Sequence, residues 1–208
     1  MTGPSPRRAG GAAAKRAFDL LTAAVALVAS SPVLAAAALA VKADDPSGPV
    51  LFRQVRVGRG GREFRILKFR SMRVSTGGPE VTSAADDRIT RVGRVLRATK
   101  LDELPQLVNV LVGDMSVVGP RPEVPRYVAQ WPAAARPEIL SVRPGITDPG
   151  SIEFRHEETE LAAAADPERH YVEVILPRKV ALYVDYVRTR SLLGDLRIIL
   201  HTFAAIAR

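Results

Sequence analysis

The longest uniform feature of the chain is an uncharged apolar run from Leu20 to Val41. As a helix, its roughly 22 residues reach about 33 Å, enough to cross a hydrocarbon core of about 30 Å. Ser31 and Pro32 interrupt the run near its middle. Proline has no N–H, and its ring clashes with the carbonyl four residues back, here that of Val28, so we expect the helix to bend. The serine hydroxyls could hydrogen-bond to the carbonyls that lose their helical partners at this bend.

Basic residues flank both ends of this run: Arg7, Arg8, Lys15 and Arg16 precede it, and Lys42, Arg53, Arg56, Arg59 and Arg62 follow it. The positive-inside rule favours the cytoplasm for both flanks. A helix that enters a membrane, turns at Ser31-Pro32 and leaves by the same face reconciles these signals. Three alternatives stay open from the pattern alone: a kinked transmembrane helix, a signal peptide cleaved near Ala38-Leu39-Ala40, and a buried soluble helix.

Outside the apolar run, residues 1–150 alternate between segments with a regular spacing of apolar residues and segments without one. Apolar and polar residues alternate on both sides of a glycine-rich turn in residues 50–73, which predicts a basic β-hairpin. Residues 75–87 are typical of a surface loop, residues 91–112 show a helical pattern, and residues 119–150 predict mostly irregular structure. Residues 1–14 predict a disordered basic tail.

The C-terminal part predicts two helices. Pro177 fits the first turn of a helix that continues to about Arg190, and Ser191 can cap the next one. The last helix places apolar residues along one stripe: Leu192, Leu196, Ile199 and Phe203. Such a stripe predicts either a face packed in the core or a face that contacts lipid at a membrane interface.

Composition narrows the class of protein. The chain has 208 residues, 47% hydrophobic but only 5% aromatic, which predicts one domain with a core mainly of Ala, Val and Leu. A net charge of +8 indicates an anionic partner: nucleic acid, a phosphorylated substrate or anionic lipid. The absence of cysteine excludes disulfides and thiolate metal sites, and three scattered histidines speak against a histidine-only metal site.

The best candidates for chemistry are the adjacent carboxylates Asp102 and Glu103, which lie in a strongly cationic stretch. Nearby cations lower the pKa of a carboxyl group, so we expect both to be ionised at neutral pH. An ionised Asp can attack phosphorus and form an acyl phosphate, and a carboxylate pair can hold Mg2+. The alternative is structural, because Thr99 and Asp102 also fit a helix start of the capping-box type.

Two basic residues are candidates for phosphate binding. Arg121 stands between Pro120 and Pro122, and this stiff segment suits the presentation of a guanidinium to phosphate. Lys68 lies between apolar neighbours on the predicted hairpin. On these residues alone, an ordinary loop and a solvated strand face remain alternative interpretations.

Several long segments, in order, resemble the bacterial sugar transferase family of small monotopic phosphoglycosyl transferases. They are KRAFD (15–19), the apolar run with Ser31-Pro32, LFRQVRVGRGGREFRILKFRSM (51–72), DRITRVGRVLRATKLDELPQLVNVLVGDMSVVGPRP (87–122) and VRPGIT (142–147). The resemblance implies an α/β, membrane-associated single domain: a re-entrant (helix-break-helix) membrane helix at residues 15–42, a short β-hairpin and amphipathic interfacial helices. Residues 43–208 would form the catalytic domain at the cytoplasmic face of the bacterial inner membrane.

The resemblance also implies roles for individual residues. Asp102 matches the family nucleophile and would contact the required cofactor, Mg2+, and Glu103 matches its partner carboxylate. Lys68, Arg97 and Arg121 match positions near the active site, with Arg121 the best phosphate candidate. The implied reaction has two steps. Asp102 attacks the sugar-proximal phosphorus of a UDP-sugar and expels UMP, and polyprenol (undecaprenyl) phosphate then takes the sugar phosphate, a reaction that initiates glycan synthesis.

The chain departs from the family pattern in one segment. After Gly-Ile-Thr many members continue with a Gly-Leu-Ala-Gln-Val-Asn-Gly-Arg-like sequence, whereas this chain reads DPGSIEFR from Asp148 to Arg155. Arg155 aligns with the final Arg of that sequence and is a substrate-binding candidate, but Glu153-Phe154 replaces Asn-Gly. The departure concerns recognition of the sugar rather than phosphoryl chemistry.

Two other classes of function explain part of the sequence. A basic nucleic-acid-binding module explains the net charge but not the apolar run, and no standard nucleic-acid motif is present, so we expect no nucleic-acid partner. A non-catalytic membrane-anchored scaffold explains the apolar run but not Asp102-Glu103 together with Arg121. The basic charge fits anionic membrane lipid as well as anionic substrates. The sequence names neither the sugar nor the glycan pathway, and it leaves formation of a homo-oligomer open.

Overall fold

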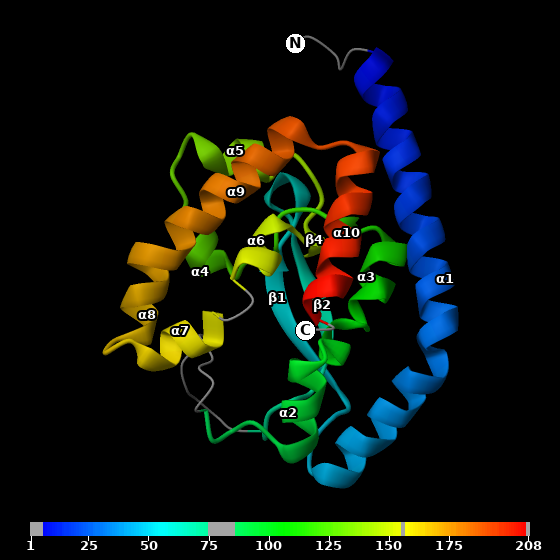
Figure 1. Cartoon of the computed structure of the whole chain (residues 1–208), viewed down its shortest axis with the longest axis vertical. Coiled ribbons are helices and arrows are strands. Elements are labelled where there is room, and N and C mark those ends of the chain that lie inside the picture. Colours follow the sequence, from blue (N-terminus) through cyan, green and yellow to red (C-terminus); the bar gives the residue numbers. More distant parts are fainter. Residues whose placement is uncertain (1–5, 75–85, 155–156, 207–208) are drawn as a thin grey trace.

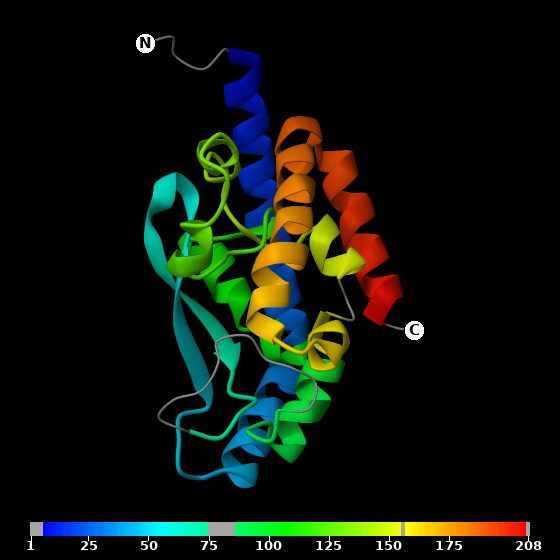
Figure 2. The same cartoon turned by 90° about the vertical axis from the view of Figure 1, so that its left-hand side faces the viewer.

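The computed structural model describes residues 6–74, 86–154 and 157–206 of the chain. It combines helices with a small antiparallel sheet, as the α/β prediction required. Helix α1 (Pro6–Asp44) runs along one side of the molecule and bends beneath it in its C-terminal half (Figure 1). Figure 2 shows the sheet on one side of the molecule and helix α10 (Leu192–Ile206) on the other, with helix α9 (Leu176–Thr189) between them.

Helix α1 contains the predicted interruption. Pro32 lies inside the helix, and the hydroxyl of Ser31 donates to the carbonyl oxygen of Val28 at 2.8 Å. Val28 is the residue whose carbonyl the proline ring displaces, so the predicted use of a serine hydroxyl is confirmed. Ser30 makes a longer contact of the same kind, 3.5 Å to the carbonyl of Leu27.

The two sides of α1 differ in burial. Ala23 and Ala37 are buried in apolar clusters of the domain, whereas Leu21 and Val28 are 69% and 75% exposed. By length and composition, α1 is the one helix among the described residues that could cross a membrane. A buried soluble helix does not leave such residues exposed, and a cleavable signal peptide does not supply core contacts, so both alternatives lose support.

The segment that we predicted as a disordered basic tail overlaps the first helix. We expected disorder at residues 1–14, but α1 already begins at Pro6, and residues 1–5 lie outside the described part of the chain. Proline is well tolerated in a first helical turn, and the alanines at 12–14 have the highest helix propensity, which outweighs the glycines before them.

The predicted hairpin is confirmed. Strands β1 (Leu51–Val57) and β2 (Glu63–Phe69) pair antiparallel over their whole length. They are joined by the 3-10 turn η1 (Arg59–Gly61), where Gly60 and Gly61 have φ of 71° and 78°. These left-handed conformations strain any residue with a Cβ, which explains the glycine-rich turn in the sequence. Of the predicted loop 75–87, residues 75–85 lie outside the described residues.

The predicted helical run 91–112 is interrupted. It consists of α2 (Arg91–Ala98), the 3-10 turn η2 (Leu101–Glu103) and α3 (Gln106–Val112). Lys100 adopts the left-handed conformation with φ of 57°, which ends α2 and redirects the chain. A non-glycine residue there costs about 1 kcal/mol, and periodicity does not reveal such a break.

Residues 119–150 are mostly irregular, as predicted, and contain only short helices and one short strand. Strand β3 (Ser116–Val118) pairs in parallel with β4 (Gly145–Thr147). The short helices α4 (Pro125–Val128) and α5 (Ala135–Ile139) lie between these strands in the sequence, and α6 (Pro149–Glu153) follows β4. Gly119 and Gly145 allow the two strands to approach closely, since a Cβ on Gly145 would lie 2.1 Å from the amide nitrogen of Gly119. This contact fixes the start of the Gly-Pro-Arg-Pro segment.

The C-terminal part contains α7 (Glu157–Ala163), α8 (Pro167–His170), the π-helical turn η3 (Tyr171–Ile175), α9 and α10. Pro177 lies in the first turn of α9, and the hydroxyl of Ser191 accepts a hydrogen bond from the amide of Gly194, so both predicted signals are confirmed. The α10 stripe is mostly exposed, Phe203 to 67%, and only its Ile199 packs on the core. The prediction that this stripe packs in the core is therefore wrong.

Candidate active site

Three of the predicted site residues meet at one carboxylate. Glu103 of η2 accepts hydrogen bonds from Lys68 of β2 at 2.8 Å and from Arg121, in the segment after β3, at 2.5 and 3.3 Å. Arg121 contacts both carboxylate oxygens, and its shorter bond shares one of them with Lys68. The structure thus brings Lys68, Glu103 and Arg121 together, although these residues lie on three separate elements.

The two cations hold Glu103 as an anion. Burial on its own would raise the pKa of Glu103, but the charges and hydrogen bonds of Arg121 and Lys68 outweigh burial and keep this pKa well below its usual range. The charge of Glu103 holds the pKa of Arg121 well above its usual range. Burial lowers the pKa of Lys68, against the opposing effect of Glu103. Glu103 therefore compensates two partly buried positive charges.

Asp102 differs from its neighbour. It is only 6% exposed, and its Oδ1 atom has no hydrogen-bond partner among the residues that the structure describes. Burial and the negative charge of Glu103 raise the pKa of Asp102, and Lys68 and Arg97 oppose them. We expected cations to lower this pKa, and that expectation is wrong, because burial is not visible in the sequence. Desolvation makes a carboxylate oxygen a stronger nucleophile and a stronger ligand.

The capping-box interpretation of this segment is not supported. The hydroxyl of Thr99 donates back to the carbonyl of Val95 at 2.8 Å, so it closes the end of α2 instead of starting a helix. The residue that caps a helix start here is Thr90, which accepts from the amide of Gly93. Asp102 therefore does not form a capping box with Thr99, although the spacing of the two residues suggested one.

Arg97 does not join the group around Glu103. Its guanidinium pairs with the half-exposed carboxylate of Glu158 on α7, although its charge still acts on Asp102. Sequence reasoning missed Glu158, because it lies 61 residues further along the chain. Its place in an acidic cluster at the start of α7 was the available signal. Arg155, the remaining binding candidate, lies outside the described residues.

The departing segment begins with a structural residue. Asp148 is fully buried and caps α6 through hydrogen bonds from the amide of Ser151 at 3.0 Å and from its hydroxyl at 2.6 Å. Burial raises the pKa of Asp148, and the positive charge of Arg121 is among the effects that oppose this. Asp148 thus contributes negative charge near Arg121, a role that the sequence pattern did not indicate.

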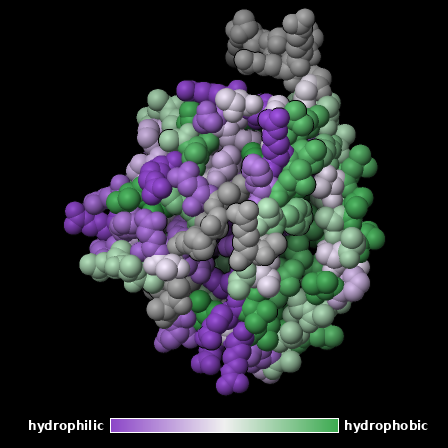
Figure 3. Space-filling model, in the orientation of Figure 1, coloured by the Kyte–Doolittle hydropathy of each residue, from purple (hydrophilic) through white to green (hydrophobic). Residues whose placement is uncertain are grey.

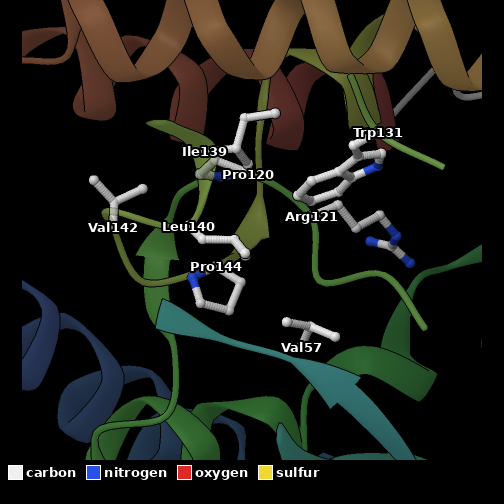
Figure 4. A pocket seen from close by; sticks show the side chains of 8 residues that line it. All are labelled: Val57, Pro120, Arg121, Trp131, Ile139, Leu140, Val142 and Pro144. Atoms are coloured by element: carbon white, nitrogen blue, oxygen red, sulfur yellow. The ribbon is translucent and has the colours of Figure 1, made fainter. Parts of the chain in front are cut away.

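A small pocket opens beside Arg121. Its other lining residues are apolar and are contributed by several elements: Val57, Pro120, Trp131, Ile139, Leu140, Val142 and Pro144. Figure 4 shows the guanidinium of Arg121 extending away from these side chains. The apolar walls contact the aliphatic part of Arg121, and its charged end remains directed to Glu103.

The residues present fit a magnesium ion only through Asp102. Within the part of the chain that the structure describes, no three His, Asp or Glu side chains gather closely enough to hold a metal. Magnesium does not need such a cage, because it keeps several waters and commonly uses one or two carboxylates with substrate phosphates. Both oxygens of Glu103 are occupied by cations, whereas Oδ1 of Asp102 is a hard donor that has no partner in the described part of the chain.

The profile of a family described as "Bacterial sugar transferase" matches residues 11–208. A UDP-glucose:undecaprenyl-phosphate glucose-1-phosphate transferase of Caulobacter vibrioides is 41% identical over 201 residues, which cover 90% of this chain and 67% of that protein. A protein of the same name from Escherichia coli is 40% identical over 192 residues, covering 90% of this chain and 39% of that protein.

A relative with a different sugar in its name is similar as well. The UDP-N-acetylgalactosamine-undecaprenyl-phosphate N-acetylgalactosaminephosphotransferase of Aeromonas hydrophila is 44% identical over 163 residues, covering 76% of this chain and 37% of that protein. The chain thus spans about two thirds of the Caulobacter protein and less than half of the other two. All three names share undecaprenyl phosphate, whereas two name glucose and the third names N-acetylgalactosamine.

Proposed function

The chain belongs to the bacterial sugar transferase family, and we propose that it moves a sugar 1-phosphate from a UDP-sugar to undecaprenyl phosphate and releases UMP. The observation that carries this proposal is the buried carboxylate oxygen of Asp102, which has no partner among the described residues and adjoins Glu103, the carboxylate that binds Lys68 and Arg121. The names of the relatives supply the substrates, and the geometry supplies a nucleophile beside anion-binding groups.

The proposed reaction is a double displacement at phosphorus. An oxygen of Asp102 attacks the phosphorus attached to the sugar, the bond from this phosphorus to the bridging oxygen breaks, and that oxygen leaves with UMP. A phosphate oxygen of undecaprenyl phosphate then attacks the same phosphorus. The bond to Asp102 breaks, the carboxylate is regenerated, and undecaprenyl-diphosphate-sugar is formed. No general base is needed in the second step, because the acceptor phosphate is already ionised.

The cations around Asp102 would bind the phosphates. Arg121 and Lys68 are held in place by Glu103, so their donors are oriented before substrate arrives. Such preorganised donors stabilise negative charge that develops on phosphoryl oxygens, and the buried setting strengthens each contact. Glu103 itself positions these two cations, and its negative charge offsets the repulsion between them.

Magnesium is the proposed cofactor. Bound through Asp102 and the diphosphate, Mg2+ would offset the repulsion between an anionic carboxylate and an anionic substrate. We therefore expect that excess EDTA abolishes UMP release by the purified full chain, and that added Mg2+ restores it. Undiminished turnover in EDTA, with a metal-free buffer as the control, would contradict the proposal.

The function is tested by the release of UMP. The full chain in lipid nanodiscs is given undecaprenyl phosphate and, in turn, UDP-glucose, UDP-N-acetylgalactosamine and other UDP-sugars. We expect UMP release that depends on one or a few of these sugars, which would also name the donor. A folded protein that releases UMP from none of them would instead support the alternative of a membrane-anchored scaffold without catalysis.

We further propose that α1 is re-entrant and that the catalytic domain lies at the cytoplasmic face of the inner membrane. Both ends of α1 contact the same domain: Arg16 donates to the carbonyl of Val110 at 2.8 Å, and Asp44 accepts from the amide of Val92 at 3.0 Å. A straight span would carry one of these ends to the opposite side of the bilayer. The bend beneath the domain (Figure 1) and the hydroxyl contact of Ser31 beside Pro32 fit a helix that returns.

Helix α10 would add to the lipid-facing surface. Its exposed apolar residues are Leu192, Leu193, Leu196, Leu200 and Phe203. Figure 3 shows hydrophobic surface gathered on the side of the molecule where α1 and α10 lie, with hydrophilic surface on the opposite side. Amphipathic helices with this distribution lie in the membrane interface, and basic residues nearby favour anionic lipid.

The topology is testable because the chain contains no cysteine. We expect that Ala14→Cys and Arg53→Cys, both at exposed positions, react with a membrane-impermeant thiol reagent only from the cytoplasmic side. Labelling after permeabilisation controls for accessibility, and the unmodified chain controls for background. Periplasmic labelling of one variant and cytoplasmic labelling of the other would demonstrate a true span.

A further inference from the structure

The segment that carries Asp102 is helical beyond its 3-10 turn. Leu104 and Pro105, which link η2 to α3, both have right-handed helical φ and ψ. The chain therefore continues in one right-handed coil from Leu101 to Val112. Along such a coil, side chains three and four residues apart share a face, so Gln106 follows Asp102 and Glu103 on the same side.

Contacts to β2 identify this face. Glu103 binds Lys68 of β2, and Asn109 makes two hydrogen bonds to the β2 backbone, accepting from the amide of Leu67 at 3.0 Å and donating to the carbonyl of Arg65 at 2.9 Å. Gln106 is three residues from each of them. It therefore lies between the site carboxylates and the Asn109 contact, on the side of the helix that packs on β2.

Gln106 is buried without using its amide. It is 1% exposed, and its Nε2 atom has no hydrogen-bond partner within the described residues. Oδ1 of Asp102, one turn earlier, is likewise buried and unpaired there. Buried polar groups are nearly always paired, so each exception calls for an explanation such as catalysis or a ligand. Here an unpaired donor and an unpaired acceptor lie on one helix face in the candidate active site.

A phosphoryl group bound to Asp102 would explain both exceptions. The carboxylate oxygen would be bonded covalently to phosphorus, so it would not need a hydrogen-bond partner. The non-bridging oxygens of the phosphoryl group would accept a hydrogen bond from the amide N–H. We propose that Gln106 is a further catalytic residue, whose side-chain amide donates to a phosphoryl oxygen of the sugar phosphate at Asp102. This inference depends on the proposed transferase function. An amide suits the position because it donates without adding positive charge beside the nucleophile.

The test replaces the amide by an apolar side chain of similar shape. Gln106→Met should lower kcat by about 100-fold, the usual loss for one preorganised donor, while KM for the UDP-sugar changes little. The thermal midpoint should stay the same or rise, because Nε2 of Gln106 has no hydrogen bond to lose within the described residues. The matched control is Asn109→Leu, which breaks two hydrogen bonds to β2 and should lower the thermal midpoint clearly.

The outcomes separate this inference from the proposed function. Wild-type release of UMP tests the function, whatever Gln106 does. If the wild type turns over and Gln106→Met keeps its kcat, only the role of Gln106 is overturned. If Gln106→Met instead loses thermal stability as Asn109→Leu does, the amide serves the fold and the inference is also overturned. A second variant, Gln106→Asn, retracts the amide by one methylene and should lower kcat without a change in the thermal midpoint.

Discussion

Asp102→Asn is expected to abolish both half-reactions, with a loss of about 10³-fold or more in kcat. The neutral amide cannot form the acyl phosphate, so neither release of UMP nor transfer to undecaprenyl phosphate can proceed through this residue. The protein should remain folded, because Oδ1 of Asp102 gives up no hydrogen bond within the described residues. UMP release and lipid-linked sugar are measured separately, in the presence of Mg2+.

The stability of this variant provides the control. Burial and Glu103 raise the pKa of Asp102, so ionisation of Asp102 costs more in the folded protein than in the unfolded chain. At pH 7, above the unfolded pKa, that cost lowers stability, and it disappears when the carboxylate is replaced by an amide. The thermal midpoint of Asp102→Asn at pH 7 should thus equal or exceed that of the wild type. Wild-type turnover by a folded Asp102→Asn variant would remove Asp102 from the mechanism.

Glu103→Gln is expected to impair activity strongly, by about 10²-fold or more, while retaining traces. The variant leaves Lys68 and Arg121 close together without the anion that compensates them, so both cations move and phosphate binding loses its geometry. Breaking this partly buried ion pair from one side, whose side chains are 12–29% exposed, also costs up to about 3 kcal/mol of folding free energy. Chemical denaturation and steady-state kinetics measure the two effects.

An exposed ion pair supplies the comparison for Glu103. Glu138 accepts two hydrogen bonds from Arg188, at 2.7 and 2.9 Å, on the surface. Exposed pairs contribute little to stability, so Glu138→Gln should change neither the denaturation midpoint nor kcat appreciably. If Glu103→Gln behaves like Glu138→Gln, Glu103 does not organise the site and the proposed role fails.

Features that depend on neighbouring residues in the sequence could be predicted. The alternation on both sides of a glycine-rich turn predicted the hairpin, and Pro177 and Ser191 marked the helices that follow them, because turn geometry and helix capping are local. For the same reason, the positions of Ser31 and Pro32 were enough to predict that a serine hydroxyl donates to the carbonyl of Val28. These predictions required no knowledge of what packs against each element.

Features that depend on packing could not be predicted in this way. The direction of the pKa shift of Asp102 was wrong, because nearby cations can be counted in the sequence whereas burial cannot. Arg97 was expected at the phosphates, but its partner Glu158 is distant in sequence. The stripe of α10 has the same pattern whether it faces the core or lipid, and only the fold shows that Phe203 is exposed.

The covalent attachment of sugar phosphate to Asp102 is the central claim, and an experiment without acceptor tests it most directly. Wild-type protein is mixed with radiolabelled UDP-sugar and Mg2+, quenched in acid, and its proteolytic peptides are weighed by mass spectrometry. We predict a burst of UMP approaching one equivalent per active site, and a mass increase of one sugar phosphate on the peptide that contains Asp102. An enzyme that turns over with both substrates present, yet gives neither a burst nor a labelled peptide without acceptor, would contradict the claim and establish direct transfer to undecaprenyl phosphate.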